Sequence, residues 1–445
     1  MKKKNSPKSE VRSPKLRIVF ILLMTLNIGH WTLDCLYSQQ LTERTLTLEE
    51  SVSLAVSNSQ QLLSAAQDIQ IAKQRLKEAR AIMYPQLEFN ANYSRFEAES
   101  PLFLSPIMGN TILPQKINEN TDEIENYYTT KISLSQVLWS GTKLSSTKKF
   151  AETEFKTAES DYGAIKNKTV ATAAKNFYKL LAMQKKLALC NASLEKLSGK
   201  KNDNANSKNR FLTDRNLEKI KSCGEKIKKD LEIARIDFLG SIGIELNTIF
   251  AIKGELEYKK VPADLNKCLA WAMEYRPELK KTQLQEQMDA LAVNLSLSGR
   301  YPTVALGGNY QLEDTQWPFE KKSWNATVNL TLPIFDGFGQ FARIKQKKYQ
   351  YRKAQINRAN ISDTIKAEVQ KSFIEYEYAI EKYEKKTKEA EMFADTPELY
   401  KNISFPEYVE ITGAVMQMQL EYIDAVRDVI ISKIDLETVV GRSVE

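Results

Sequence analysis

The stretch LTLPIFDGFGQ, residues 330–340, begins with alternating apolar and polar residues and then meets a proline, an aspartate and two glycines. The alternation belongs to residues 323–332, which have the period-2 pattern of a strand with two different faces. Pro333 has no N–H to offer a neighbouring strand, and Gly337 and Gly339 allow a sharp change of backbone direction. We therefore expect a strand that ends abruptly and turns into a different element.

A similar stretch, LSQVLWSGTKL at residues 134–144, occurs earlier in the chain. Its Gly141 corresponds to Gly337 at an offset of 337 − 141 = 196. Val137 stands where the later stretch has Pro333, so we expect Gly141 to carry more of the bend in the first stretch.

The chain is duplicated. TLEESVSLAVSNSQQLLSAAQ (47–67) matches DLNKCLAWAMEYRPELKKTQL (264–284) at an offset of 264 − 47 = 217, and the same offset relates 84–93 to 301–310. The change of offset, 217 − 196 = 21, means that the first copy has 21 extra residues, which fall in the Pro- and Asn-rich segment 97–126. Repeats of this kind determine the architecture before any other feature does.

Both copies contain, in order, a helix, a pair of strands, a long helix and a returning helix. In the first copy, residues 39–245, we predict strands at 85–96 and 127–136, a long helix at 141–207 and a return helix at 212–245. In the second copy, residues 264–443, we predict strands at 302–313 and 323–332, a long helix at 337–396 and a return helix at 407–440. An equatorial linker, 246–263, joins the copies.

The four strands fit a membrane. An ordinary soluble sheet with one solvated face would show the same alternation, but each strand is about the 9 to 11 residues that a tilted membrane strand needs. The smallest membrane barrels have about eight strands, so four must share a barrel with other copies of the chain. Two copies would give a filled interior, and three would give twelve strands with room for a channel.

The two proline-free runs predict helices on the order of 90 to 100 Å long, at ~1.5 Å per residue, which must pack side by side. Apolar residues at alternating spacings of four and three predict a heptad seam in the last helix. Its members are Tyr408, Ile411, Val415, Met418, Tyr422, Ala425, Val429, Ser432, Leu436 and Val439. A second stripe, Ile423, Val426, Ile430 and Ile434, predicts neighbours on two sides. The fold class is mainly α with membrane β.

The first 38 residues have the features of a signal peptide, 1–38. Basic residues precede the apolar run IVFILLMTLNI (18–28), which is too short to span a bilayer, and we place cleavage near Ser38. Cys35 raises the alternative of a lipoprotein, although Asp34 before it is unlike the usual small residue. Seven basic and two acidic residues give this segment a charge of 7 − 2 = +5 out of the formal +8, which leaves +3 and a weak case for nucleic acid.

Catalysis is not expected. The single histidine, His30, lies in the signal segment, so a cleaved chain has no imidazole for a nucleophile pair or a metal. Cys190, Cys223 and Cys268 form no CxxC pair. A hairpin turning at 206–207 would bring Cys190 opposite Cys223, as either a disulfide or a pair of buried free thiols. We expect no enzyme, cofactor or metal site.

In this order, the landmarks resemble the TolC family of outer-membrane efflux proteins. The resemblance covers residues 46–443 and is carried by LTLEESVSLAVSNS, YPQL, YPTV, LSQVLWSG, LPIFDG and LETVVG. It implies a homotrimer with a twelve-stranded β-barrel in the outer membrane of a diderm bacterium, continuous with a long periplasmic α-helical barrel. It also implies a periplasmic adaptor protein and an inner-membrane pump of RND, ABC or MFS type.

The resemblance also places functional residues. The adaptor-docking tips correspond by position to Arg210, Phe211, Leu212, Thr213, Ile403, Ser404, Phe405 and Pro406. The family often has a glycine in each tip turn, which this chain lacks, so these positions are equally well explained as plain turn residues. Glu407 and Glu410 resemble the carboxylates of the periplasmic entrance, with solvated helix-face glutamates as the alternative. Gly141, Pro333, Gly337 and Gly339 mark the strand-to-helix bends.

Three functions compete. The first is a passive conduit from the periplasm to the exterior, powered by a partner pump. The second is an adhesive or structural coiled-coil trimer, which does not explain why the chain returns to the membrane twice. The third is an exported enzyme built on a carboxylate pair. The residues leave the cargo open among drugs, metal ions and secreted proteins.

Overall fold

The computed structural model describes residues 44–97, 124–198, 207–316, 318–394 and 403–443. The expected signal segment 1–38, with His30 and Cys35, lies outside these residues, as does most of the loop 97–126. No helix among the described residues is both long enough and apolar enough to cross a membrane.

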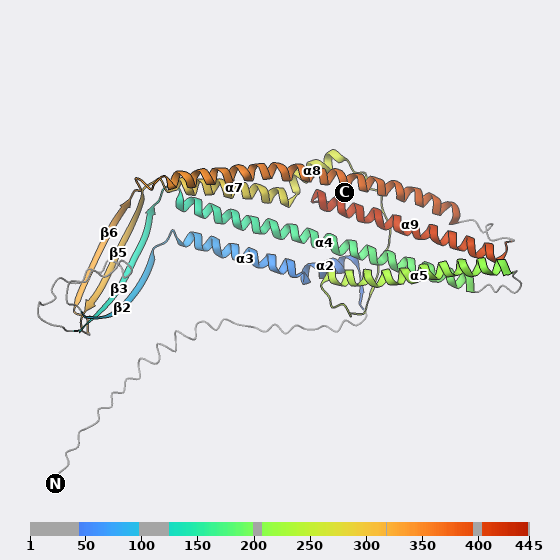
Figure 1. Ribbon diagram of the computed structural model, residues 1–445, viewed down its shortest axis with the longest axis horizontal. Helices are drawn as coiled ribbons and strands as arrows, with labels where there is room; N and C mark the ends of the chain where they lie inside the picture. Colours follow the sequence, from blue (N-terminus) through green and yellow to red (C-terminus); the bar gives the residue numbers. More distant parts are fainter. Residues whose placement is uncertain (1–43, 98–123, 199–206, 317, 395–402, 444–445) are drawn as a thin grey trace, which may run out of the picture. The chain divides into compact units, whose positions relative to one another are not determined.

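Helices and strands alternate in blocks along the chain (Figure 1). The helices are α2 (Leu48–Asn58), α3 (Gln60–Ala81), α4 (Lys143–Ser198), α5 (Ser207–Ile242), α6 (Leu265–Tyr275), α7 (Pro277–Ser298), α8 (Gly339–Ala394) and α9 (Phe405–Val440). The strands are β1 (Arg44–Leu46), β2 (Gln86–Glu97), β3 (Ile124–Trp139), β4 (Phe250–Ile252), β5 (Thr303–Asp314) and β6 (Lys321–Thr331).

The duplication is confirmed, and the helix lengths repeat. The helices α2 and α6 both have 11 residues, and α3 and α7 both have 22. The long helices α4 and α8 both have 56 residues, and the return helices α5 and α9 both have 36. Even the ends match, because Gly243 and Gly441 follow α5 and α9 with φ values of 68° and 84°. Left-handed backbone of this kind ends a helix most easily at glycine.

The opening helix of each copy is two helices, which corrects the single helix predicted there. In the first copy Ser59 separates α2 from α3, and its side chain accepts a hydrogen bond from the N–H of Leu62 at 3.3 Å. In the second copy Arg276 and Pro277 make the break. The Arg276 guanidinium is nearly buried and donates to Glu368 at 3.0 Å and to the carbonyl of Val439 at 2.9 Å, so the break ties α7 to α8 and α9.

The main sheet has the strand order β2-β3-β5-β6, with every neighbouring pair antiparallel. The register places apolar and polar residues in alternate rows across it. One row is Leu87, Leu134, Gly308 and Ala326, and the adjacent row is Glu88, Ser133, Asn309 and Asn325. In the apolar face, Leu87 and Trp324 are 73% and 78% exposed. Within the chain, therefore, nothing described covers the face that a soluble protein would bury.

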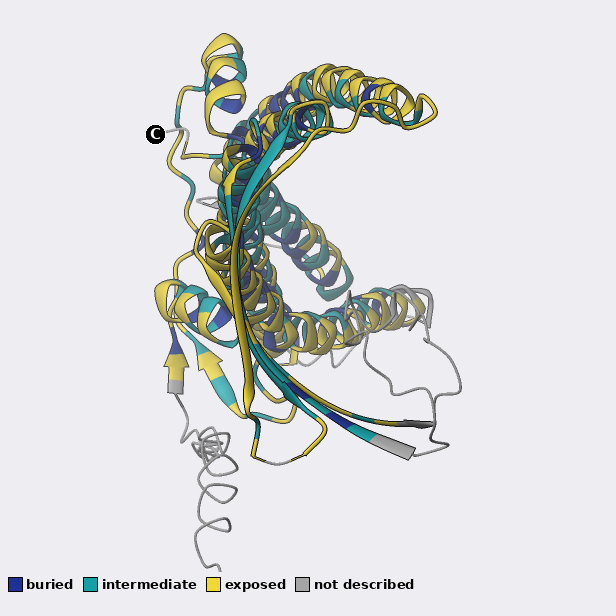
Figure 2. Ribbon diagram, turned by 90° about the vertical axis from the view of Figure 1, so that its left-hand side faces the viewer, coloured by how far each residue is buried: buried dark blue, intermediate teal, exposed yellow. Residues whose placement is uncertain are grey.

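The helices pack around α4. Among the described elements, α4 contacts α3, α7, α5 and α9, while α8 contacts α7, α6 and α9. A large apolar cluster joins both copies and includes Phe177, Phe238, Val369 and Leu436. Figure 2 shows buried residues along the sides where helices meet, whereas the strands are mostly intermediate or exposed. The core therefore lies in the helices, not on the sheet.

The buried stripe of α9 differs in part from the predicted seam. The first half buries Val409, Thr412, Met416 and Leu420, each one or two residues beyond its predicted counterpart. Further along, Ala425, Val429 and Leu436 are buried as predicted, and Val426 and Ile430 of the second stripe are buried too. The reason is the number of neighbours: α9 contacts α4, α5 and α8, so no single heptad stripe describes its buried surface.

The region predicted as a plain linker, 246–263, contains a strand. This strand, β4, pairs with β1, and the N–H of Lys253 donates to the carbonyl of Leu46 at 3.0 Å. Phe250 packs against Phe238 with ring centroids 5.5 Å apart. The linker is therefore fastened to the helical core and to the start of the first copy.

Candidate functional site

The first predicted docking tip is helical rather than a turn. Helix α5 begins at Ser207 rather than at 212, so Arg210 and Phe211 lie in its first turns instead of preceding it, and Leu212 and Thr213 follow in the same helix. No helix breaker follows Ser207, which explains the earlier start. Phe211 is 66% exposed, whereas Thr213 is buried at 4%. Phe211 is thus an apolar side chain available for contact, and Thr213 is not; the side chains of Arg210 and Leu212 lie outside the described part.

The second tip starts a helix as well. Ile403 and Ser404 precede α9, and Phe405 and Pro406 are its first residues, two positions before the predicted start. Proline suits this place because the first N–H groups of a helix have no partner within it. Of the predicted tip residues, Ser404 is exposed and Ile403, Phe405 and Pro406 are half-buried.

Glu407 helps to cap α9. Its carboxylate accepts hydrogen bonds from the N–H and the Oγ of Ser404, both at 2.9 Å. These bonds, the backbone one first, lower the pKa of Glu407 and keep it ionised. Glu410 lies on the exposed side of the same helix. An entrance role for the two carboxylates stays a prediction, and the cap is a local reason for the first of them.

A second apolar cluster lies beneath both tips. Its buried members are Cys190, Leu197, Ile220, Ile227, Val409, Met416 and Leu420. They come from α4, α5 and α9, and Phe405 and Tyr408 pack against them. The two tips thus pack on one shared apolar cluster, and a substitution at one tip can alter the packing of the other.

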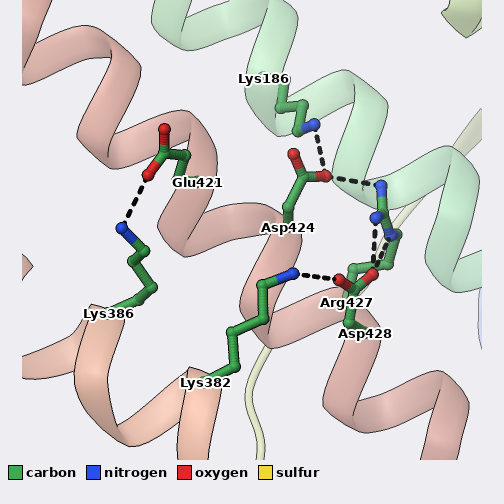
Figure 3. A network of polar contacts seen from close by, with 7 residues as sticks. All are labelled: Lys186, Lys382, Lys386, Glu421, Asp424, Arg427 and Asp428. Carbon is green, nitrogen blue, oxygen red and sulfur yellow. Dashed lines mark hydrogen bonds and ion pairs between the residues drawn. The ribbon is translucent and has the colours of Figure 1, made fainter. Parts of the chain in front are cut away.

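A network of charged side chains joins α4, α8 and α9 (Figure 3). On the α4 side, Lys186 pairs with Asp424, which also binds Arg427 at 2.6 Å. On the α8 side, Lys382 pairs with Asp428 at 2.9 Å, and Lys386 with Glu421 at 2.7 Å. Arg427 also binds Asp428 at 2.6 Å, so it connects the Lys186–Asp424 pair to the Lys382–Asp428 pair.

The network is partly buried, so its charges depend on one another. The Lys186 side chain is only 10% exposed. Burial alone would raise the pKa of Asp428, but hydrogen bonds from Lys382 and Arg427 lower it overall. The hydrogen bond from Lys386 does most to lower the pKa of Glu421. The ion pairs of Lys382 and Lys386 join α8 to α9, and that of Lys186 joins α4 to α9.

Sequence reasoning missed this network, although a signal was present. The acids of α9 stand at 421, 424 and 428, spacings of three and four that place them along one side of a helix. The bases Lys382 and Lys386 are also four apart. Because many surface helices carry such charges, the spacing alone does not identify partners on other helices.

The strand-to-helix bends use left-handed backbone in both copies. Gly141 has φ 61° and Gly337 has φ 65°. The second copy adds another left-handed residue, Phe338 with φ 65°, where glycine at 339 had been expected to supply the freedom. Gly339 instead begins α8 and packs near Asp336, whose carboxylate accepts from the N–H of Gln340 at 2.7 Å. Pro333 lies two residues beyond Thr331, the end of β6, and is outside the paired register.

Comparison with known proteins identifies the class of molecule to which this geometry belongs. The sequence profile of one family, described as outer membrane efflux protein, matches residues 51–198 and 270–393. These segments lie in the two copies and make up more than half of the chain. No curated protein sequence matches the chain.

Solved structures share the fold. The CmeC outer membrane channel of Campylobacter jejuni matches with a TM-score of 0.71 at 17% identity, over 88% of this chain and 85% of that one. The MtrE outer membrane channel of Neisseria gonorrhoeae, in its open state, matches with a TM-score of 0.72 at 15% identity, over 89% of each chain. A membrane protein from Pseudomonas aeruginosa matches with a TM-score of 0.71 at 16% identity, over 88% and 92%. The expected fold is thereby confirmed.

Proposed function

The chain belongs to the outer membrane efflux protein family, and we propose that three copies of it close one channel by pairing the free edges of their sheets. As a member it is the outer-membrane channel component of an efflux system, located in the outer membrane and extending into the periplasm. Channels of this family are trimers that work with an adaptor and an inner-membrane pump. The adhesive alternative is not favoured.

The main support for a shared barrel is that the four-stranded sheet has two open edges. Strands β2 and β6 each have one paired neighbour among the described strands, so each presents a row of unpaired backbone groups. In a bilayer such groups must find partners, because lipid offers none. The first and last strands of an antiparallel set of four run in opposite directions. Placing β6 of one copy beside β2 of the next therefore continues the antiparallel pattern.

The number of copies follows from the interior. Two copies would supply 2 × 4 = 8 strands and three would supply 3 × 4 = 12. A barrel of about eight strands is just filled by its own side chains, whereas a wider one leaves space for passage. The row Glu88, Ser133, Asn309 and Asn325 would face that space, while the apolar row faces lipid.

The helical hairpins supply the other end of the conduit. We place adaptor docking at the two tips, with Phe211 as the exposed apolar anchor on α5 and residues 403–406 as the second contact. Exposed aromatic side chains are frequent anchors of protein interfaces. The energy for export comes from an inner-membrane pump of RND, ABC or MFS type, and the chain itself carries out no chemistry.

Cysteine cross-linking tests the edge pairing. In a chain whose native cysteines are replaced by serine, Asn90→Cys on β2 and Thr327→Cys on β6 are expected to cross-link neighbouring copies in the membrane. The product ladder should end at three chains. Each single variant is the matched control and should give no ladder. The proposed closure is contradicted if the ladder ends at two chains. It is also contradicted if cysteine pairs placed at several different β2–β6 registers give no cross-link.

Tip variants test the docking surface. Deleting 203–211 and 398–405 should leave trimers in the membrane and abolish export of toxic compounds. A sharper pair is Phe211→Asp against Ile249→Asp, since the two side chains are 66% and 67% exposed but only the first lies at a tip. Loss of export with Phe211→Asp alone supports docking there. Equal export by both variants, or survival of export after both deletions, contradicts it.

A further inference from the structure

Two cysteines face each other across the first hairpin. Cys190 lies on α4 and is completely buried, in the apolar cluster beneath the tips. Cys223 lies on α5, is half-buried, and packs against the same cluster. A Cβ added to Gly224, the next residue, would lie 4.0 Å from the Cβ of Cys190. The Cβ of Cys190 therefore lies close to the α5 backbone next to Cys223.

The thiols themselves interact. Burial, together with the adjacent Cys223 and its hydrogen bond, raises the pKa of Cys190 to about 11. Cys268 is buried in the other apolar cluster, with α6 and the long helices, and takes no part in this contact. Both thiols of the hairpin are free in the structure.

We propose that Cys190 and Cys223 are a site of oxidative modification, at which the two thiols form a disulfide after export. The inference rests on the proposed function in one respect, because the hairpin of an outer-membrane channel matures in the periplasm, where disulfides form and persist. The partner is a periplasmic protein that carries a reactive disulfide, or a small disulfide such as oxidised glutathione.

The reaction is two successive thiol–disulfide exchanges. The more accessible Cys223, as thiolate, attacks one sulfur of the donor disulfide and releases the other sulfur as a thiolate. Cys190 then loses its proton and attacks Cys223 in this mixed disulfide, which displaces the second donor thiolate. The chain loses two electrons and two protons, and the donor disulfide is reduced to two thiols.

The cross-link would make the two hairpins unequal. It encloses 223 − 190 − 1 = 32 residues, including the start of α5 with Phe211. A closed loop restricts the unfolded chain and holds the hairpin together. Helices α8 and α9 contain no cysteine, so the second hairpin stays without such a bond. Any movement at the tips would then fall to the second hairpin.

The first experiment uses the full chain extracted from outer membranes without reductant. The protein is denatured in N-ethylmaleimide, digested, and mapped by mass spectrometry. The expected result is a linked pair of peptides containing Cys190 and Cys223, lost on reduction, with Cys268 recovered as the adduct. Recovery of Cys190 and Cys223 as adducts, from protein that fractionates with the outer membrane, overturns the inference while leaving the channel function intact.

A second arm does not depend on localisation. Purified, reduced protein is incubated with oxidised glutathione and mapped in the same way. Closure of the 190–223 pair is expected, and glutathione adducts on either cysteine without closure overturn the inference. If the protein forms the disulfide in this experiment but is absent from the outer membrane, the result contradicts the proposed function and still supports the Cys190–Cys223 pairing.

Variants separate the cross-link from general packing. Cys268→Ser should keep the linked peptides, whereas Cys190→Ser and Cys223→Ser should each lose them. In the wild-type chain, reduction should speed hydrogen exchange at 207–220 several-fold, because the start of α5 is released. Reduction of Cys223→Ser should change nothing there. The same response in the variant as in the wild type would contradict the role of the bond.

Discussion

The hairpins α4–α5 and α8–α9 have the same helix lengths, 56 and 36 residues, but different interactions hold them. Among the described residues, no ion pair links α4 to α5, and their contact near the tips consists mainly of apolar side chains and two thiols. The pairs Lys382–Asp428 and Lys386–Glu421 join α8 to α9. The duplicated copies have thus kept their geometry while their contacts differ, so the two hairpins should respond to different conditions.

The largest effects are expected in the core, where the copies can be compared at one equivalent position. Phe177 and Phe373 correspond at the offset of 196 and are 1% and 8% exposed. Phe177→Ala should cost about 3–5 kcal/mol, and Phe373→Ala less, because a more exposed ring loses less on truncation. Thermal unfolding of the purified protein measures both. A larger loss from Phe373→Ala would show that the second copy dominates the core.

The two strand-to-helix bends should also tolerate substitution differently. Both Gly141→Ala and Gly337→Ala place a Cβ on left-handed backbone, at roughly 1–2 kcal/mol. The Cβ at 141 would also lie 2.8 Å from Cδ2 of Tyr301, whereas nothing lies within 4 Å of the one at 337. The yield of assembled protein in the membrane should therefore fall more for Gly141→Ala. Equal yields would mean that Tyr301 moves aside freely.

Within the charged network, the buried end should matter more than the exposed end. Asp424→Asn leaves Lys186, 10% exposed, without its carboxylate and should cost about 3 kcal/mol. Lys382→Met removes a more exposed pair and should cost about 0.5–1 kcal/mol, less at high salt. Denaturant unfolding at two salt concentrations gives both values. A salt-independent loss for Lys382→Met would count against an electrostatic contact.

The smallest effects on stability are expected from pH: acid should weaken the α8–α9 hairpin, and alkali should weaken the α4–α5 hairpin. The pKa values of Asp428 and Glu421 are lowered in the folded chain, so their stabilisation is present above about pH 4, the unfolded value, and is lost as the pH falls further. The pKa of Cys190 is raised, so its stabilisation is present below about pH 8.5 and is lost as the pH rises toward 11.

Hydrogen exchange of each hairpin checks this prediction. Acid should loosen α8–α9 first, and alkali should loosen α4–α5 first. The alkaline effect should appear only in reduced protein, because a disulfide has no proton to lose. Loosening of both hairpins at the same pH would contradict the comparison.

Much of the fold was accessible from the sequence because its signals are long and repeated. The alternation in β5 and β6 and the absence of proline from the long helices each extend over many residues, and the duplication supplies every element twice. Boundaries were less accessible. The starts of α5 and α9 depend on one or two local residues, such as Ser404 with Glu407, whose hydrogen bonds compete with the turn expected there.

Contacts between distant segments were the least accessible. The pairing of β4 with β1 involves strands of 3 residues each, too short for any alternation to appear. The ion pairs of Lys186 and Arg427 depend on which faces of α4 and α9 meet, and a pattern along one helix does not determine that. For the proposed docking residues, the sequence predicted a turn at Arg210 and Phe211, whereas both lie in α5, and their docking role stays a prediction.

The two open edges of the sheet have a consequence for biogenesis. A single copy cannot enter a bilayer with unpaired β2 and β6, so insertion and oligomerisation must be one concerted event. Until then the periplasm holds chains with exposed strand edges, which are templates for aggregation. A cell that makes one defective edge variant alongside the normal chain should therefore lose most of its channels, because a single faulty copy spoils the whole ring.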